Sequence, residues 1–174
     1  LAQKDTNGNC TDGITRVYSY LTNHLFGDIR IKTMYGWDHT KYLNIYIVKN
    51  IIDPTHGGTT LGYAPIPSMM MPEEDGVTMR SDCVGSIGTA ASGAFNMQVG
   101  RSVTHEVGHW MGLFHIWGDD VCGDDNITDT PPAEGPNSGC PAFPCHPNNT
   151  CGAGPNGEMS WNYMDYSDGI CQNL

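Results

Sequence analysis

The alternation of apolar and polar residues predicts few regular elements, most of them before residue 113. Apolar residues recur with a helical period from Ile14 to Phe26, which predicts a helix over that range. The run from Tyr42 to Val48 is apolar on both faces and predicts a central strand. A second helix is expected from Gly100 to Gly112, where a glycine ends it. Shorter strands are expected at residues 61–65, 75–79 and 82–87.

The segment after His115 shows no such period. Residues 118–157 are rich in Gly, Pro, Asp, Asn and Cys, a composition that predicts loop. The order of helix, strands, helix and irregular lobe is typical of an α+β chain. Its 174 residues fit one domain, which we divide into an N-terminal sub-domain (residues 1–112) and a C-terminal sub-domain (residues 113–174).

Charge and hydropathy exclude several classes of partner. The chain carries 19 acidic against 8 basic residues, a formal net charge of -11, which repels nucleic-acid phosphates and anionic membranes. No segment approaches the ~18 consecutive apolar residues of a membrane-spanning helix. We therefore expect neither nucleic-acid binding nor membrane insertion, whereas divalent cations and basic peptides are favoured.

The cysteines indicate an oxidising compartment. Five of the seven lie after residue 121, in a segment too polar to form much apolar core, and disulfides usually stabilise such segments. An odd number leaves at least one thiol unpaired within the chain. A cysteine-rich zinc site is the alternative, but no CxxC pair occurs. We expect a secreted protein, and spacing alone leaves the disulfide connectivity open.

One eleven-residue string, from His105 to His115, contains the residues expected to carry the chemistry: HEVGHWMGLFH. Histidines four apart on a helix project from one face, so His105 and His109 can reach one Zn²⁺ at ~2.0–2.1 Å. Gly112 can take the left-handed conformation that ends a helix and turns the chain, which brings His115 back as third ligand. Three protein ligands leave the fourth position to water, as in catalytic zinc sites.

Glu106 directly follows the first ligand and lies beside the metal in this arrangement. We expect its carboxylate to take the proton of the attacking water as general base and to hand it to the leaving amine as general acid. The alternative is a core helix whose histidines are hydrogen-bonded and metal-free. The extended spacing, with a glycine at the bend, argues against that alternative.

The same string resembles the zinc signature of the metzincin metallopeptidases. Metzincins have a methionine turn beneath the metal, and the segment from Ser160 to Tyr166 resembles it, with Met164 as its methionine. Taken alone, Met164 would be assigned to the core. Tyr166 matches a tyrosine that, in several metzincins, lies near the metal and steadies the transition state.

Further strings, spread over nearly the whole chain, resemble the pappalysin family of metzincins. They are Asp5–Asn9, Gly13–Arg16, Tyr42–Tyr46, Leu61–Ala64, His105–Trp110, Asp129–Pro131 and Asn162–Tyr166. The resemblance implies a metzincin-type α+β zincin: an N-terminal twisted mixed sheet with helices, an irregular C-terminal lobe stabilised by disulfides and calcium, and an active-site cleft between them. Family members have a strand before Leu1 and a helix after Leu174, so we expect a chain trimmed at both ends, with a pro-segment or other portions flanking it.

The resemblance also assigns roles outside the zinc string. Asp168 would lie at the floor of the first primed pocket and favour Arg or Lys after the cut. An edge strand pairing with extended substrate would comprise Leu61, Gly62, Tyr63 and Ala64. Oxygen ligands for Ca²⁺ would come from Asp124, Asp125, Thr128, Asp129 and Thr130. The alternative for residues 61–64 is an ordinary strand, and the alternative for residues 124–130 is a solvated acidic loop. The implied disulfides join Cys122 to Cys151 and Cys145 to Cys171, with Cys10, Cys83 and Cys140 unassigned.

The hypothesis from sequence is therefore a secreted zinc-dependent endopeptidase with protein or peptide substrates, a catalytic Zn²⁺ and a structural Ca²⁺. Another metzincin branch, astacin-like or matrix-type, is the rival among enzymes. The rival from a different class is a non-catalytic peptide-binding module derived from a peptidase, against which the intact Glu106 argues.

Overall fold

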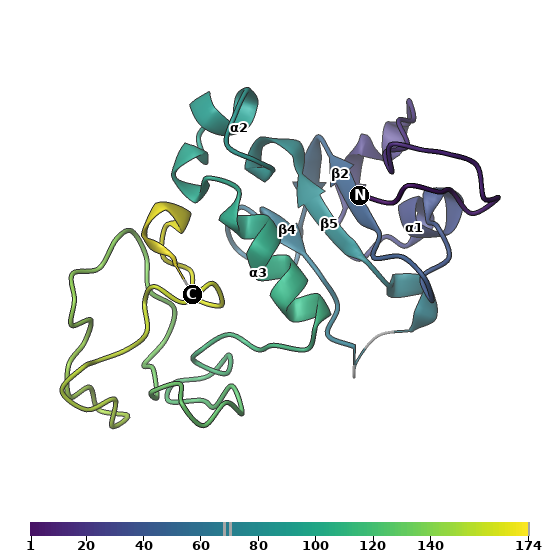
Figure 1. Cartoon of the computed structure of the whole chain (residues 1–174). Helices are drawn as coiled ribbons and strands as arrows, with labels where there is room; N and C mark the ends of the chain where they lie inside the picture. The colour runs from purple at the N-terminus through teal and green to yellow at the C-terminus, as the bar shows by residue number, and fades with distance from the viewer. Residues whose placement is uncertain (68, 70, 174) are drawn as a thin grey trace. The chain divides into compact units, whose positions relative to one another are not determined.

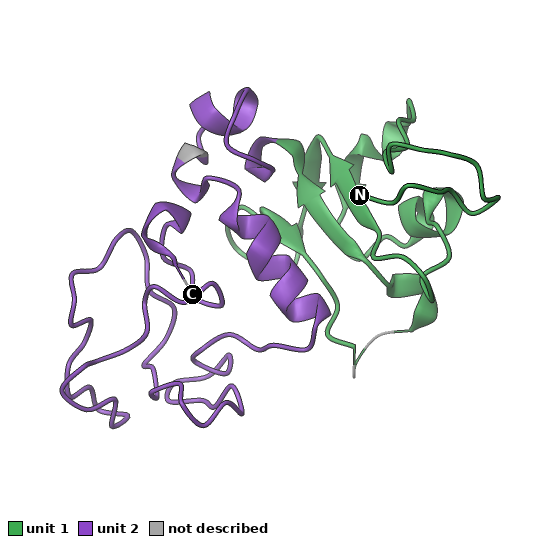
Figure 2. Ribbon diagram, viewed as in Figure 1, with its two compact units in different colours: residues 1–81 green, residues 82–174 purple. Residues whose placement is uncertain are grey.

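The structure is a computed structural model that describes residues 1–67, 69 and 71–173. The chain forms two compact units, Leu1–Ser81 and Asp82–Leu174 (Figures 1 and 2). The boundary falls well before residue 112, where the sequence suggested dividing the chain, so the histidine helix belongs to the same unit as the loops that follow it. That both units belong to one catalytic domain stays a prediction.

In its described residues, the first unit contains two small sheets and one short α-helix. Its elements are η1 (Tyr20–Thr22), β1 (Asn23–Leu25), α1 (Arg30–Tyr35), β2 (Ile45–Val48), β3 (Asn50–Ile52), β4 (Gly62–Tyr63), η2 (Pro72–Glu74) and β5 (Val77–Arg80). Strands β1 and β3 pair in parallel. In the other sheet β5 lies between β2, to which it is parallel, and β4, to which it is antiparallel. The sheet is therefore mixed, as the fold class predicted.

The central strand of this sheet is β5, not the run from Tyr42 to Val48. Val77 and Met79 of β5 are fully buried, whereas Ile45 and Ile47 of β2 are 42% and 56% exposed. The face of β2 that points inward carries Tyr46 and Val48, which join the core cluster with Leu21, Ile31 and Ile51. The expectation of a central strand was wrong because apolar residues on both faces of a strand need not both be buried.

The helix predicted from Ile14 to Phe26 is also wrong. The segment forms only the turn η1 and the strand β1. Its apolar residues at 14, 17, 18, 20 and 25 are exposed whereas Leu21 is buried, so the helical period does not mark one continuous buried face. Ser19 starts η1 because its hydroxyl accepts a hydrogen bond from the Leu21 N–H at 3.2 Å. The helix α1, which periodicity did not indicate, follows Asp28, whose carboxylate accepts from the Arg30 N–H at 3.0 Å.

Among its described residues, the second unit has one substantial helix, α3 (Arg101–Trp110), and otherwise consists of short helical segments, turns and loops. Its other elements are the end of η3 (Ser81–Cys83), then α2 (Thr89–Ser92), η4 (Asn96–Gln98) and η5 (Gly169–Cys171). The strand expected at residues 82–87 does not form, because Gly85 and Gly88 adopt left-handed φ angles of 83° and 63° that break an extended run. The prediction of irregular loop at 118–157 is confirmed.

Two disulfides crosslink this irregular segment. Cys122 bonds to Cys151, as the family resemblance implied. The second bond joins Cys171 to Cys140 rather than to Cys145, so that expectation was wrong. Cys145 is held elsewhere: its backbone carbonyl accepts a hydrogen bond from the Glu158 N–H at 2.7 Å, and its side chain is buried.

Candidate active site

Helix α3 buries a polar face. Its buried residues are Ser102, His105, Glu106, Gly108 and His109. A glutamate is almost never fully buried unless it is paired, and buried polar side chains need hydrogen bonds or a metal to satisfy them. The composition of this face therefore points to a site rather than to ordinary core packing.

The end of α3 turns the chain back toward this face. Gly112 has a φ of 96°, and the Leu113 N–H donates to the Gly108 carbonyl at 3.0 Å. A Cβ at position 112 would meet nothing within 4 Å. Glycine is thus favoured by the left-handed backbone, not by lack of space. The turn places His115 beside the two helix histidines.

The three Nε2 atoms of His105, His109 and His115 form a small triangle. They lie 3.1 Å apart for the helix pair, 3.2 Å between His105 and His115, and 3.1 Å between His109 and His115. Two ligands ~2.0–2.1 Å from one tetrahedral zinc are roughly 3.3–3.4 Å apart. The observed spacing fits three nitrogens sharing one such ion.

Backbone carbonyls fix the orientation of the two helix histidines. His105 donates from Nδ1 to the Tyr163 carbonyl at 2.6 Å, and His109 donates from Nδ1 to the Leu113 carbonyl at 2.8 Å. A carbonyl only accepts, so the proton of each neutral ring is on Nδ1. The lone pairs of both Nε2 atoms then face one another with no proton between them, an arrangement that a cation stabilises.

A carboxylate fixes the third histidine. Asp119 Oδ1 accepts from His115 Nδ1 at 2.5 Å, and the Trp117 ring stacks on the imidazole with centroids 4.3 Å apart and planes 4° apart. A carboxylate behind a ligating histidine is the usual outer support of a zinc site. Sequence reasoning missed both residues, although an acid four positions after the last histidine of the string was a usable signal.

Burial keeps the helix histidines neutral. It lowers the pKa of His105 to about 3, and it also lowers the pKa of His109. Neutral imidazole is the form that binds a metal. At any pH near neutrality these two rings are therefore ready to act as ligands.

Met164 lies against the underside of α3. It is buried, packs with Ile116, Trp117 and Ala133, and its carbonyl accepts from the Ile116 N–H at 3.3 Å. A Cβ at Gly108 would lie only 2.4 Å from the Met164 sulfur, so the glycine allows this close approach. The same turn supplies the Tyr163 carbonyl that orients His105. The methionine segment thus supports the histidine helix from below.

Tyr166 stands at the rim of the triad. Its ring centroid lies 4.8 Å from that of His115 and 5.6 Å from that of His105. Burial, together with the negative charges of Glu106 and Asp119, raises its pKa to about 12. The hydroxyl therefore stays protonated near neutral pH and can donate a hydrogen bond.

The acidic loop expected to bind calcium is held by local hydrogen bonds. Asp124 accepts from the Asn126 N–H at 2.7 Å, and Asp125, which is buried, accepts from the Ile127 N–H at 2.9 Å. In the part of the chain that the structure describes, the carboxylates of this loop do not belong to a group of three ligand atoms within 4.8 Å. A calcium site at residues 124–130 stays a prediction.

The expected substrate strand is present in shortened form. Only Gly62 and Tyr63 are paired, at one edge of the mixed sheet, and the Leu61 carbonyl accepts from the Arg80 N–H at 2.9 Å. Asp168 precedes η5, and its N–H donates to the Gly139 carbonyl at 2.7 Å. Contact of these residues with substrate stays a prediction.

A mixed sheet, a histidine helix ended by a glycine bend, and a buried methionine beneath it define a metzincin-type metallopeptidase fold. A family model described as pregnancy-associated plasma protein-A matches residues 28–174, and the chain belongs to this family of peptidases, the pappalysins. The comparison agrees with the family resemblance found in the sequence.

Solved structures and curated relatives agree with this assignment. Mirolysin in complex with compound 9 aligns with a TM-score of 0.85 at 40% identity, over 100% of this chain and 64% of that one. Mature mirolysin of Tannerella forsythia in complex with a cleaved peptide aligns at 0.78 and 39%, with the same coverage. Extracellular metalloprotease 1 of Coccidioides posadasii is 37% identical over 137 residues, which are 75% of this chain and 44% of that protein. An extracellular metalloprotease of Colletotrichum graminicola is 36% identical over 135 residues, or 74% and 43% of the two chains.

The chain thus spans less than half the length of these curated relatives and about two thirds of mirolysin. Among the residues that the structure describes, no helix is long and apolar enough to cross a membrane.

Proposed function

We propose that this chain is the catalytic part of a secreted zinc-dependent endopeptidase. The observation that supports the proposal most directly is the Nε2 triangle, 3.1–3.2 Å on a side, in which every ring also engages an acceptor through Nδ1. The extracellular metalloproteases among the relatives support the secreted location.

The groups around the triad suit peptide hydrolysis. Zinc, when held by His105, His109 and His115, lowers the pKa of a water and polarises the scissile carbonyl. Glu106, buried on the same helix face, takes the proton from the attacking water and passes it to the leaving amine. The protonated Tyr166 hydroxyl donates to the oxyanion that develops on the carbonyl.

The substrate is an extended peptide that adds to the edge of β4. An edge strand offers unpaired backbone donors and acceptors for antiparallel addition, and the mirolysin structure with a cleaved peptide favours a peptide ligand. Asp168 gives a preference for Arg or Lys after the cut. Calcium bound by Asp124, Asp125, Thr128, Asp129 and Thr130 stiffens the loop after the triad.

Glu106→Gln tests the catalytic role. We expect the variant to retain its zinc, measured by metal analysis, and to lose at least ~10²-fold in kcat/KM on a casein-derived peptide. Glu134→Gln is the matched control, because Glu134 accepts hydrogen bonds from Thr150 rather than from α3. Undiminished cleavage by Glu106→Gln, or cleavage of the wild type that a zinc chelator leaves unaffected, would refute the proposal. Peptide binding without cleavage would favour the non-catalytic binding module.

A further inference from the structure

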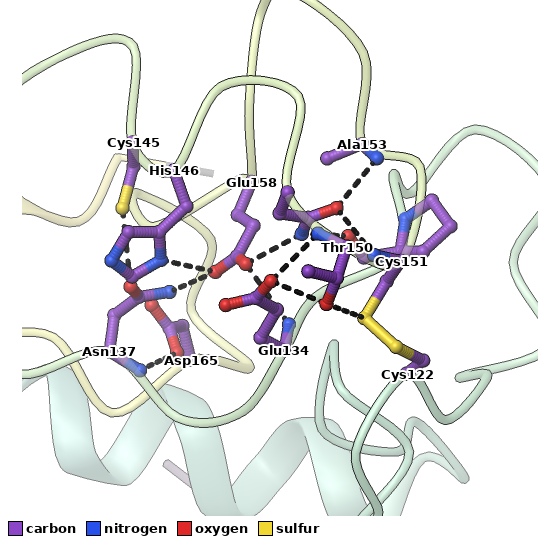
Figure 3. A network of polar contacts seen from close by, with 12 residues as sticks. Cys122, Glu134, Asn137, Cys145, His146, Thr150, Cys151, Ala153, Glu158 and Asp165 are labelled. Carbon is purple, nitrogen blue, oxygen red and sulfur yellow. Dashed lines mark hydrogen bonds and ion pairs between the residues drawn. A yellow bond between two sulfur atoms is a disulfide. The ribbon is translucent and has the colours of Figure 1, made fainter.

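A second polar cluster, separate from the histidine triad in its residues, is centred on Glu158 (Figure 3). Glu158 is fully buried, and four groups donate to its carboxylate. Oε1 accepts from the Glu134 N–H at 3.0 Å and from Asn149 Nδ2 at 2.7 Å. Oε2 accepts from Asn137 Nδ2 at 3.1 Å and contacts His146 Nδ1 at 3.1 Å.

These hydrogen bonds keep Glu158 ionised. Burial alone would raise the pKa of its carboxyl, but the donors around it outweigh burial and hold the pKa below its usual range. A buried charge requires a partner of opposite sign. Among the described residues, the ion pair recorded for Glu158 is with His146, which carries a charge only when protonated.

A buried thiol lies beside this carboxylate. Cys145 is 3% exposed, takes part in neither disulfide, and donates from its thiol to Asn137 Oδ1 at 3.2 Å. One ligand atom from each of Cys145, His146 and Glu158 lies within 4.8 Å of the other two. Sulfur, imidazole nitrogen and carboxylate oxygen are all ligands of zinc-like ions.

The backbone fixes this juxtaposition. The Glu158 N–H donates to the Cys145 carbonyl at 2.7 Å, and bridges join Cys145 to both Gly157 and Glu158. Gly157 has a φ of 72°, and a Cβ there would lie 1.8 Å from the Cys145 oxygen, so only glycine permits the two segments to approach this closely. His146 itself adopts a left-handed φ of 43°, which is uncommon for a residue other than glycine.

We propose that Cys145, His146 and Glu158 form a second metal site, for a divalent transition ion of the zinc type. The mixed sulfur, nitrogen and oxygen donors favour Zn²⁺ or Co²⁺ over Ca²⁺ and Mg²⁺, which take oxygen ligands. The site has three protein ligands, so water completes a tetrahedral shell.

Binding exchanges protons for the ion. The thiol proton leaves to solvent, and the imidazole proton moves from Nδ1 to Nε2, so that Nδ1 can bind the ion; the His146 side chain is 58% exposed. The ion then takes the place of the proton between Nδ1 and Oε2. The present 3.1 Å separation of these atoms is close to the roughly 3.3 Å expected for two ligands of one tetrahedral ion. The thiolate and carboxylate together balance the charge of the ion.

Cobalt substitution tests the site, because a thiolate bound to Co²⁺ gives a charge-transfer absorption in the near ultraviolet that histidine ligands do not give. The full chain is stripped with a chelator, refilled with excess Co²⁺ and dialysed. We expect the charge-transfer band and two tightly bound ions per chain. Cys145→Ser should abolish the band and remove one ion, and His146→Ala should weaken cobalt binding at this site by at least ~10-fold.

Matched controls separate this site from the other thiols and from the triad. Cys10→Ser and Cys83→Ser replace the other two cysteines that take part in neither of the two disulfides and should leave the band intact. His109→Ala should remove the ion of the triad and keep the band, so failure of the proposed catalytic function would not be mistaken for failure of this site. A wild-type protein that binds one cobalt ion without the band, or a band that survives in Cys145→Ser, would show that the cluster only stabilises the lobe.

Discussion

Replacing Asp119 removes a side chain that orients His115 of the histidine triad. His105 and His109 donate to backbone carbonyls, which every side-chain substitution leaves in place. His115 lies outside the helix and donates to the Asp119 carboxylate at 2.5 Å. In Asp119→Ala this hydrogen bond is lost, and the imidazole keeps only the stacking of Trp117 to orient it.

The expected loss of zinc affinity for Asp119→Ala is ~10–100-fold, which is typical when a carboxylate behind a ligating histidine is removed and corresponds to about 1.4–2.8 kcal/mol. Asp119→Asn keeps an acceptor oxygen but loses the charge. The Asp119 side chain is 59% exposed, so solvent screens much of that charge. We therefore expect the asparagine variant to lose less affinity than the alanine variant.

Competition with a chromophoric zinc chelator measures the dissociation constant of each variant. Cleavage at saturating zinc should remain within about tenfold of wild type, because the reacting groups are unchanged. Asp120→Ala removes the same charge from the same loop, and its carboxylate accepts from the Val121 N–H rather than from a ligand. If Asp119→Ala binds zinc as tightly as Asp120→Ala does, the carboxylate does not support His115.

Three further substitutions or titrations test other parts of the structure. Tyr166→Phe should keep its zinc and lose ~10²–10³-fold in kcat/KM, and unchanged kinetics would remove Tyr166 as an oxyanion donor. Gly157→Ala should lower the free energy of unfolding, measured with urea, far more than Gly152→Ala does, because a Cβ at position 157 would lie 1.8 Å from the Cys145 oxygen. Gly152, at φ 90°, has open space around it, so alanine there adds only about 1–2 kcal/mol of backbone strain. Equal losses of stability in the two variants would contradict the close approach of Gly157 to Cys145. Burial lowers the pKa of Lys32 to about 8 from 10.5. Between those two pH values the unfolded chain therefore binds more protons at this side chain than the folded chain does, and the free energy of unfolding rises with pH across that window. An NMR titration midpoint of the Lys32 ammonium near 10.5 would refute this.

The convergence of the three histidines could be predicted from sequence because its determinants are local. Residues four apart on one helix share a face whatever the rest of the fold does, and a glycine bend acts on its own neighbours. The partners of the ligands could not be predicted in the same way. The acceptor for His105 is the backbone carbonyl of Tyr163, 58 positions away, and a main-chain atom leaves no mark in the amino-acid sequence.

The wrong predictions from sequence also concern features that depend on contacts between distant parts of the chain. Apolar periodicity from Ile14 to Phe26 predicted a helix, but periodicity reports a helix only where one continuous face is buried, and here Leu21 is buried while Ile14, Val17 and Leu25 are exposed. Cys171 bonds to Cys140, while Cys145 forms backbone bridges with Gly157 and Glu158. Such long-range pairing is invisible in cysteine spacing.

The covalent crosslinks of the C-terminal segment have a consequence for how this protein must be made. Residues 111–168 supply His115, Met164 and Tyr166 without a helix or strand among the described positions. The two disulfides span 29 and 31 residues. In the chain-entropy model, each lowers the entropy of the unfolded chain and so stabilises the folded protein by about 3.5 kcal/mol. In a reducing cytosol the two disulfides would not form, and this stabilisation would be lost. The loop residues of the site, His115, Met164 and Tyr166, would then lose their ordered positions first. Productive expression accordingly calls for export or for an oxidising host.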